Sequence, residues 1–120
     1  MSNDTVKAVR AAMPLEVREV QYNDPVLSIS GDGWWLTLMC PWLIRGRNGQ
    51  YSWEVDEVED KVWDLIGHSI VSVSFDSGVE VDPTFEFDGE ISLEICADSD
   101  WEPWTMQVPG LVVIGRKKGG

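Results

Sequence analysis

The chain has 120 residues, of which 43% are hydrophobic and 25% charged, so its length and composition are those of one folded domain. Its acidic residues number 21 against 9 basic ones, which gives a net charge of −12. Because nucleic acids and anionic membranes attract Lys and Arg, a chain this acidic is a poor candidate for binding either.

The first half predicts short strands separated by turns, after an N-terminal segment (residues 1–14) that we expect to be loose. In residues 26–30, Leu27 and Ile29 share one face and serines the other, which is typical of a half-buried strand. The Asn48-Gly49 pair indicates a two-residue hairpin turn. The strands expected here cover residues 17–22, 26–30, 34–40, 42–47 and 50–55.

One short helix is predicted next. Asp56 can cap it, with Glu59 three residues later as in a capping box, and Gly67 can end it. Its apolar stripe consists of Val58, Val62, Leu65 and Ile66. A helix of about ten residues is too short to be stable alone, so it must dock on a sheet.

Strands resume in residues 71–75 and continue to an apolar run at 111–114, followed by a loose tail, 116–120. We therefore predict one β-rich α+β domain over residues 1–120, with an antiparallel meander of about eight strands and one short helix. An offset of 56 aligns Asp32-Gly33 with Asp88-Gly89 and Cys40 with Cys96. This is weak self-similarity between residues 15–55 and 68–115, and a chance match of common turns explains it nearly as well.

The negative charge is concentrated in one part of the sequence. Residues 1–53 sum to zero, residues 54–102 hold sixteen acids and only Lys61 as a base, and residues 103–120 sum to +3. The acidic part is either a solvated face or an electrostatic match for a basic partner.

The sequence also predicts a cytoplasmic protein. No stretch approaches the length of a membrane span, and the polar first ten residues do not form an export signal. Cys40 and Cys96 are therefore expected to be reduced, half-buried thiols.

Groups that carry catalysis are scarce. The single histidine, His68, follows the predicted helix and is expected to satisfy its last carbonyls. Asp98-Ser99-Asp100-Trp101-Glu102 has alternating carboxylates but lacks the glycine and the final glutamate of a calcium loop. We expect no metal, no cofactor and no enzymatic activity, although a pair among the sixteen carboxylates stays an alternative.

The seven tryptophans are the second unusual feature. Trp34 and Trp35 are adjacent on a strand and must face opposite sides of the sheet, so some tryptophans lie outside the core or under a loop. Aromatic side chains surrounded by carboxylates suit docking on a basic protein surface. The predicted contact residues are Asp98, Asp100, Trp101, Glu102 and Trp104, with Glu86, Asp88 and Glu90 as a second acidic set.

The segment Asp100-Trp101-Glu102-Pro103-Trp104, followed by Pro109-Gly110 and an apolar strand, resembles the C-terminal signature of a family of small uncharacterised bacterial proteins. The resemblance covers roughly residues 60–115, and more weakly 15–55, and it departs around Asp82-Pro83-Thr84. It implies a fold but no activity. In style, the chain also resembles immunity proteins of bacterial toxin systems.

Two classes of function follow. The first is an immunity protein that neutralises a basic toxin domain such as a nuclease. The second is a β-rich domain that binds a small ligand, or an enzyme with a carboxylate pair. Either of these would have an apolar pocket with convergent polar groups, and a carboxylate of raised pKa. A homodimer with tryptophans at its interface is a third alternative.

Overall fold

The structure, a computed structural model, describes residues 2–23, 26–47, 49–52, 62–75, 81–96 and 104–115. Within these ranges it has one α-helix, α1 (Ser2–Ala11), one short 3-10 helix, η1 (Trp63–Leu65), and eleven strands in two sheets. The predicted β-rich, antiparallel class is confirmed. The described strands are more numerous than the eight expected, and they form two sheets.

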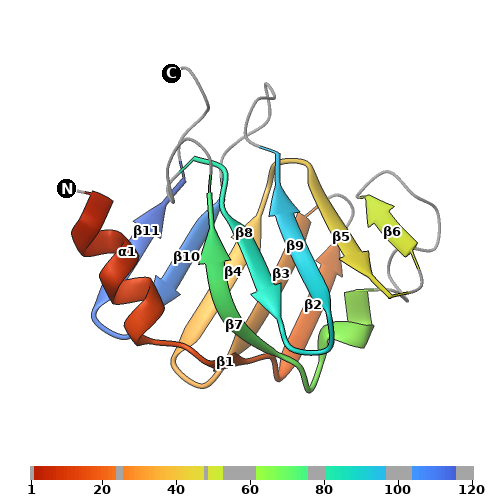
Figure 1. The fold of residues 1–120 in the computed structure, drawn as a ribbon, viewed down its shortest axis with the longest axis horizontal. Coiled ribbons are helices and arrows are strands. Elements are labelled where there is room, and N and C mark those ends of the chain that lie inside the picture. The colour runs from red at the N-terminus through yellow and green to blue at the C-terminus, as the bar shows by residue number, and fades with distance from the viewer. Residues whose placement is uncertain are drawn as a thin grey trace.

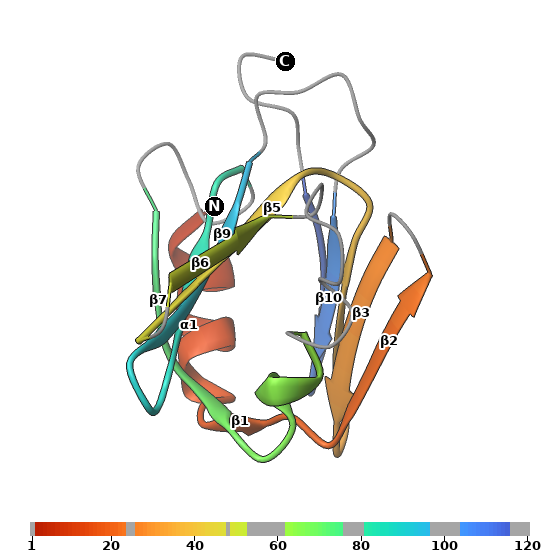
Figure 2. The same ribbon diagram turned by 90° about the vertical axis from the view of Figure 1, so that its right-hand side faces the viewer.

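The two sheets pack face to face as a β-sandwich (Figures 1 and 2), and the buried side chains form a core between them. The six-stranded sheet has the order β1 (Leu15–Glu16), β7 (Ser69–Ser74), β8 (Thr84–Phe87), β9 (Ile91–Ile95), β5 (Trp42–Gly46) and β6 (Gly49–Ser52). The five-stranded sheet has the order β11 (Leu111–Ile114), β10 (Thr105–Val108), β4 (Trp34–Leu38), β3 (Val26–Gly31) and β2 (Glu19–Asn23). All of these strand pairs are antiparallel.

Alternation of apolar and polar residues decides which side of a strand enters the core. In β3, Leu27 is buried, while the Ser28 hydroxyl lies 3.1 Å from that of Thr37 on β4 and shares a hydrogen bond with it. The adjacent Trp34 and Trp35 face opposite sides of β4, as predicted: Trp34 is buried and Trp35 half-buried. The two-residue period of the sequence therefore carries over directly into the packing.

Two predicted turns depend on glycine. Gly33 and Gly89 both have φ of +76°, a left-handed conformation that glycine adopts without strain, in the β3–β4 and β8–β9 turns. The hairpin predicted at Asn48-Gly49 also exists. Gly46 pairs with Gly49, so Gly49 belongs to β6 and not to the turn, where it was expected.

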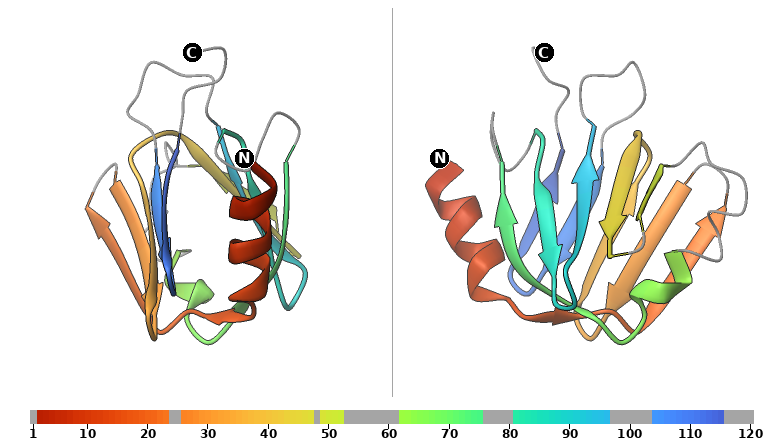
Figure 3. Two further views of the ribbon diagram at one scale, coloured as in Figure 1. Left: turned by 90° about the vertical axis from the view of Figure 1, so that its left-hand side faces the viewer. Right: turned by 45° about the vertical axis from the view of Figure 1, so that its right-hand side comes forward.

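The N-terminal segment is a helix, so the prediction that residues 1–14 are loose is wrong for Ser2–Ala11. Val6 and Val9 lie one helical turn apart and are both buried, which gives α1 an apolar stripe. Arg10 fixes the last turn by donating to the Val73 carbonyl of β7 at 3.2 Å. Figure 3 shows α1 at one edge of the sandwich, between the two sheets.

The helix predicted between Asp56 and Gly67 falls largely on residues 53–61, outside the described residues. Its described end is η1, which lies between the sheets at the edge opposite α1 (Figure 2). Val62 and Leu65 are buried, as the apolar stripe predicts, but Ile66 is exposed. Gly67 has φ of +93°, which suits its predicted role in ending the helix.

The two segments that showed weak self-similarity, 15–55 and 68–115, have their matched strands in different sheets. Strand β4 belongs to the five-stranded sheet and β9 to the six-stranded sheet. The expected loose tail, 116–120, lies outside the described residues. Neither of the described helices is long and apolar enough to cross a membrane.

Candidate functional site

The predicted contact residues divide into two groups. Asp98, Asp100, Trp101 and Glu102 lie outside the described residues, so the structure gives no account of them. Glu86, Asp88, Glu90 and Trp104 are described. Trp104 directly precedes β10, at the end of the sandwich opposite the β8–β9 turn (Figure 1), so it does not share a surface with the other three.

Trp104 is a core residue, which corrects its prediction as a surface anchor. Its side chain is 1% exposed and packs edge-on against Phe85, with ring centroids 6.4 Å apart and planes at 87°. Its indole nitrogen has no hydrogen-bond acceptor among the described residues. An aromatic ring enclosed in this way is not available to a partner.

The three acidic residues Glu86, Asp88 and Glu90 are exposed and lie together on β8 and the turn that follows it. Glu86 stands between Ser72 and Ser92 of the neighbouring strands, and it forms no ion pair with any described residue. Glu90 pairs with Arg47 across the six-stranded sheet. Of the predicted contact residues, these three form one surface.

His68 binds Asp88 through its ring. Its Nδ1 donates to Asp88 Oδ1 at 2.8 Å, and the Ser69 N–H donates to the same oxygen at 3.2 Å. Both hydrogen bonds lower the pKa of Asp88 below its ordinary value, and the bond from His68 has the larger effect. The expected link to the helix carbonyls is made by the His68 backbone, whose N–H donates to Leu65 at 3.0 Å, and not by the ring.

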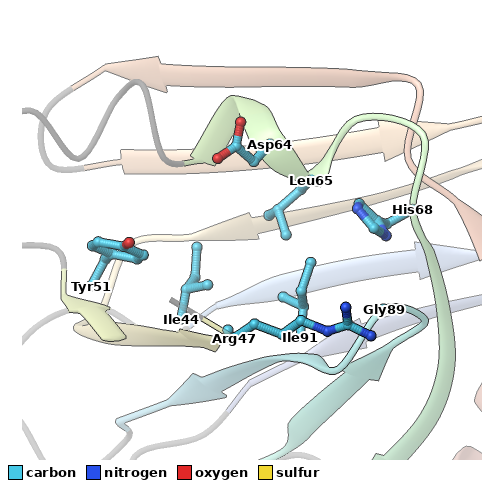
Figure 4. A pocket seen from close by; sticks show the side chains of 9 residues that line it. Ile44, Arg47, Tyr51, Asp64, Leu65, His68, Gly89 and Ile91 are labelled. Carbon is cyan, nitrogen blue, oxygen red and sulfur yellow. The ribbon is translucent and has the colours of Figure 1, made fainter. Parts of the chain in front are cut away.

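A pocket of about 340 Å³ opens beside these acidic residues. It lies between η1, β5, β6 and the β8–β9 turn, and residues from five separate parts of the chain contribute to it. They are Ile44, Gly46, Arg47, Tyr51, Asp64, Leu65, His68, Gly89 and Ile91. Figure 4 shows Leu65 of η1 facing Ile44 and Ile91, with Tyr51 on one side of the pocket and His68 on the other. Sequence reasoning missed this site.

The pocket has an apolar floor and a charged rim. Ile44 and Leu65 are buried, which leaves hydrophobic surface at its base. Two lining side chains pair with carboxylates beside the rim: Arg47 with Glu90, and His68 with Asp88. Asp64 forms no ion pair with any described residue and is exposed. Three carboxylates, of Asp64, Asp88 and Glu90, therefore outnumber the two basic side chains of Arg47 and His68 at and beside the rim.

The excess of acid extends over the described surface, which holds ten acidic and five basic side chains. Each of the four described arginines already has a partner within the chain. Arg10 donates to a backbone carbonyl, and the other three form ion pairs: Arg18 with Glu16 and Asp32, Arg45 with Glu94, and Arg47 with Glu90. Exposed carboxylates thus outnumber the available cations.

The two cysteines are not joined in a disulfide. Cys40 is buried and Cys96 half-buried, and the Cys96 N–H donates to the Pro41 carbonyl at 2.9 Å. Burial, followed by the charge of Cys96, raises the pKa of Cys40 to about 11. Cys40 is therefore a protonated, structural thiol at neutral pH.

Among the described residues, no group of three or more His, Cys, Asp or Glu side chains is placed to hold a metal ion. The chain matches no protein-family model, no curated protein and no solved structure. The resemblance to small bacterial proteins over residues 60–115 therefore stays a prediction.

Proposed function

We propose that this protein is a binding module for a basic protein, and specifically an immunity protein that neutralises a basic toxin domain such as a nuclease. The observation that carries the proposal is the unequal pairing of charges. Every described arginine is engaged within the chain, while exposed carboxylates at Glu86 and Asp64 have no cationic partner among the described residues.

Unpaired surface carboxylates favour association with a cationic partner in two ways. They raise the encounter rate at low salt, toward ~10⁸ M⁻¹s⁻¹ for well-steered pairs, and they disfavour acidic competitors. Folding alone gains nothing from them, because like charges on one surface repel. Glu86 lies on an open strand surface between two serines, where a partner can reach it without displacing an internal ion pair.

The proposed role is binding and not catalysis. The single histidine is hydrogen-bonded to Asp88, and the pKa of that carboxylate is lowered, whereas a general acid acting near neutral pH needs a raised one. We further propose a cytoplasmic location, where Cys40 and Cys96, which form no disulfide, would stay reduced.

Capture of partners from the native host, with the partners identified by mass spectrometry, tests the proposal. We expect a polypeptide with a basic domain that is retained at low salt and lost at high salt. Glu86→Lys should slow association with that partner about threefold to tenfold at low salt. Glu19→Lys makes the same charge change on β2 of the other sheet and should have a smaller effect.

The double variant Asp100→Lys with Glu102→Lys tests the remaining predicted contacts in the same assay. Association rates that are unchanged in it would remove those residues from the interface. An acidic partner, or capture that is insensitive to salt, would contradict the proposed function as a whole.

The pocket favours a second candidate function, the binding of a free small molecule. Its volume of about 340 Å³ lies at the small end of the usual range for ligand sites, roughly 300–1,000 Å³, and its apolar floor with a polar rim is typical of them. Loss of the pocket's ligand would leave capture of a basic protein intact, so the two functions separate experimentally.

A further inference from the structure

We infer that the pocket between η1 and the β8–β9 turn receives one lysine or arginine side chain of the basic partner. The inference rests on the proposed function and adds the position at which the partner is anchored. Its basis is the combination, at one cavity, of an apolar floor, an aromatic lining residue and an excess of carboxylates at and beside the rim.

The shape of the site suits a long side chain with a polar end. Leu65 and Ile44 are buried at the floor, and Figure 4 shows them facing each other across the cavity. Lys and Arg place an aliphatic stem of three or four carbons on apolar surface while the charged group stays near water. The partly open cavity of about 340 Å³ therefore fits one such residue rather than a folded segment.

The charges of the rim select a cation over an anion. Arg47 is the one described arginine in the lining, and Glu90 neutralises it. Asp64 in the lining, together with Asp88 and Glu90 beside it, outnumbers the basic groups of Arg47 and His68, so the rim is net negative. An anionic ligand would have to break the Arg47–Glu90 pair and approach two carboxylates, whereas a cation meets a favourable field directly.

The same charges indicate where the cationic group lies. Arg47 extends along the sheet toward Gly89 (Figure 4), so its side chain occupies that end of the pocket. Asp64 projects from η1 on the side of Tyr51. The cation is therefore held at the Asp64 carboxylate, in the pocket whose lining also contains the aromatic ring of Tyr51.

Binding of single-residue probes tests the inference without the partner. Nα-acetyl-lysine N-methylamide and its arginine counterpart are titrated into the ¹⁵N-labelled protein at low salt, and amide shifts are followed. We expect saturable shifts confined to the pocket lining, with a Kd on the order of millimolar. The norleucine analogue, which keeps the stem and lacks the charge, should bind at least fivefold more weakly.

Asp64→Asn removes the carboxylate assigned to the cation and should weaken lysine binding about fivefold. Asp4→Asn is the matched control, because it changes the net charge equally on α1, at the opposite edge of the sandwich. It should leave the affinity within about twofold.

Three results would overturn the inference: no shifts in the pocket lining, equal binding of the lysine and norleucine analogues, or tighter binding of Nα-acetyl-glutamate N-methylamide. The proposed function fails separately. If a basic partner is captured in a salt-dependent way and Asp64→Asn does not slow or weaken its binding, the partner binds elsewhere and only the pocket assignment is lost.

Discussion

Gly115→Ala should destabilise the fold through one contact in the core. A Cβ atom at Gly115 would lie 2.5 Å from Nε1, 2.6 Å from Cδ1 and 2.8 Å from Cε2 of Trp104. The best separation for such atoms is about 3.5–4.0 Å, so the overlap is roughly 1 Å. The indole cannot move aside easily, because it is 1% exposed and packs against Phe85. We expect a loss near the upper end for overpacked cores, about 3 kcal/mol.

A double-mutant cycle isolates this contact. Trp104→Leu alone should cost about 3 kcal/mol, because it leaves a cavity. In that background the methyl group of Gly115→Ala has room, so the double variant should be more stable than the sum of the single losses by about 2 kcal/mol. Urea and thermal unfolding followed by circular dichroism measure both quantities, and 3 kcal/mol corresponds to a Tm decrease of roughly 12 °C in a domain of this size.

Gly46→Ala is the control for the glycine change itself. Its Cβ would be 4.0 Å from Ile91 Cγ1, an ordinary contact, so its free energy of unfolding should change by less than about 1 kcal/mol. A Gly115→Ala protein as stable as the wild type, or strict additivity with Trp104→Leu, would refute the placement of Trp104 in the core. Trp104 would then return to the set of surface residues.

Three further predictions concern charge, the thiol and the helix. The pKa of Asp88 is lowered in the folded protein, so ionised Asp88 stabilises the fold at pH values above the ordinary pKa of aspartate. This stabilisation is lost as the pH falls through the lowered pKa. His68→Ala should raise the pKa of Asp88, as measured by ¹³C NMR titration. The pKa of Cys40 is raised in the folded protein, so protonated Cys40 contributes about 2 kcal/mol to the free energy of unfolding below pH ~9. This contribution is lost as the pH rises toward 11. Cys40→Ala should flatten this alkaline loss of stability, and a steep loss that persists would contradict it. Val9→Ala should cost about 2 kcal/mol and Lys7→Ala less than about 0.5 kcal/mol in urea unfolding; equal, negligible effects would mean that α1 is not part of the core.

The strands were predictable because alternation is a local property of the sequence. Leu27 and Ser28 lie on the buried and outer sides of β3 as their polarity requires. The division into two sheets was not predictable in this way. The chain passes from β4 in one sheet to β5 in the other within residues 39–41, and no local pattern states which distant strand each one joins.

Helix α1 was missed because its apolar stripe is short. Val6 and Val9 are its described buried residues, and they do not make a helix stable by themselves. The helix is stabilised by the packing of Val6 and Val9 in the core of the sandwich and by the hydrogen bond from Arg10 to β7. Both features exist only after the sheets have formed.

The pocket was missed for a related reason. Arg47, Asp64 and His68 lie on three separate segments, and nothing in their spacing indicates that they line one cavity. The sequence held one weak signal for part of the site. His68 directly precedes β7 and Asp88 directly follows β8, so antiparallel pairing of these two strands brings the two side chains together. Trp104 was misassigned because its acidic neighbours in sequence suggested exposure, whereas its side chain is buried in the core.

The uneven charge of the sequence does not persist unchanged in space. Residues 54–102 sum to −15 and residues 1–53 to zero, yet β5 of the first half pairs with β9 of the second. This pairing places Arg45 beside Glu94, and the hairpin loop after β5 brings Arg47 to Glu90. Part of the acid is therefore neutralised by bases from the other half of the chain. The attraction for a cationic partner must therefore come from the carboxylates that this topology leaves unpaired. Among the described residues of the acidic segment, these include Glu86 and Asp64. Substitutions of Glu86 or Asp64 should change the salt dependence of binding more than substitutions of Glu90 or Glu94.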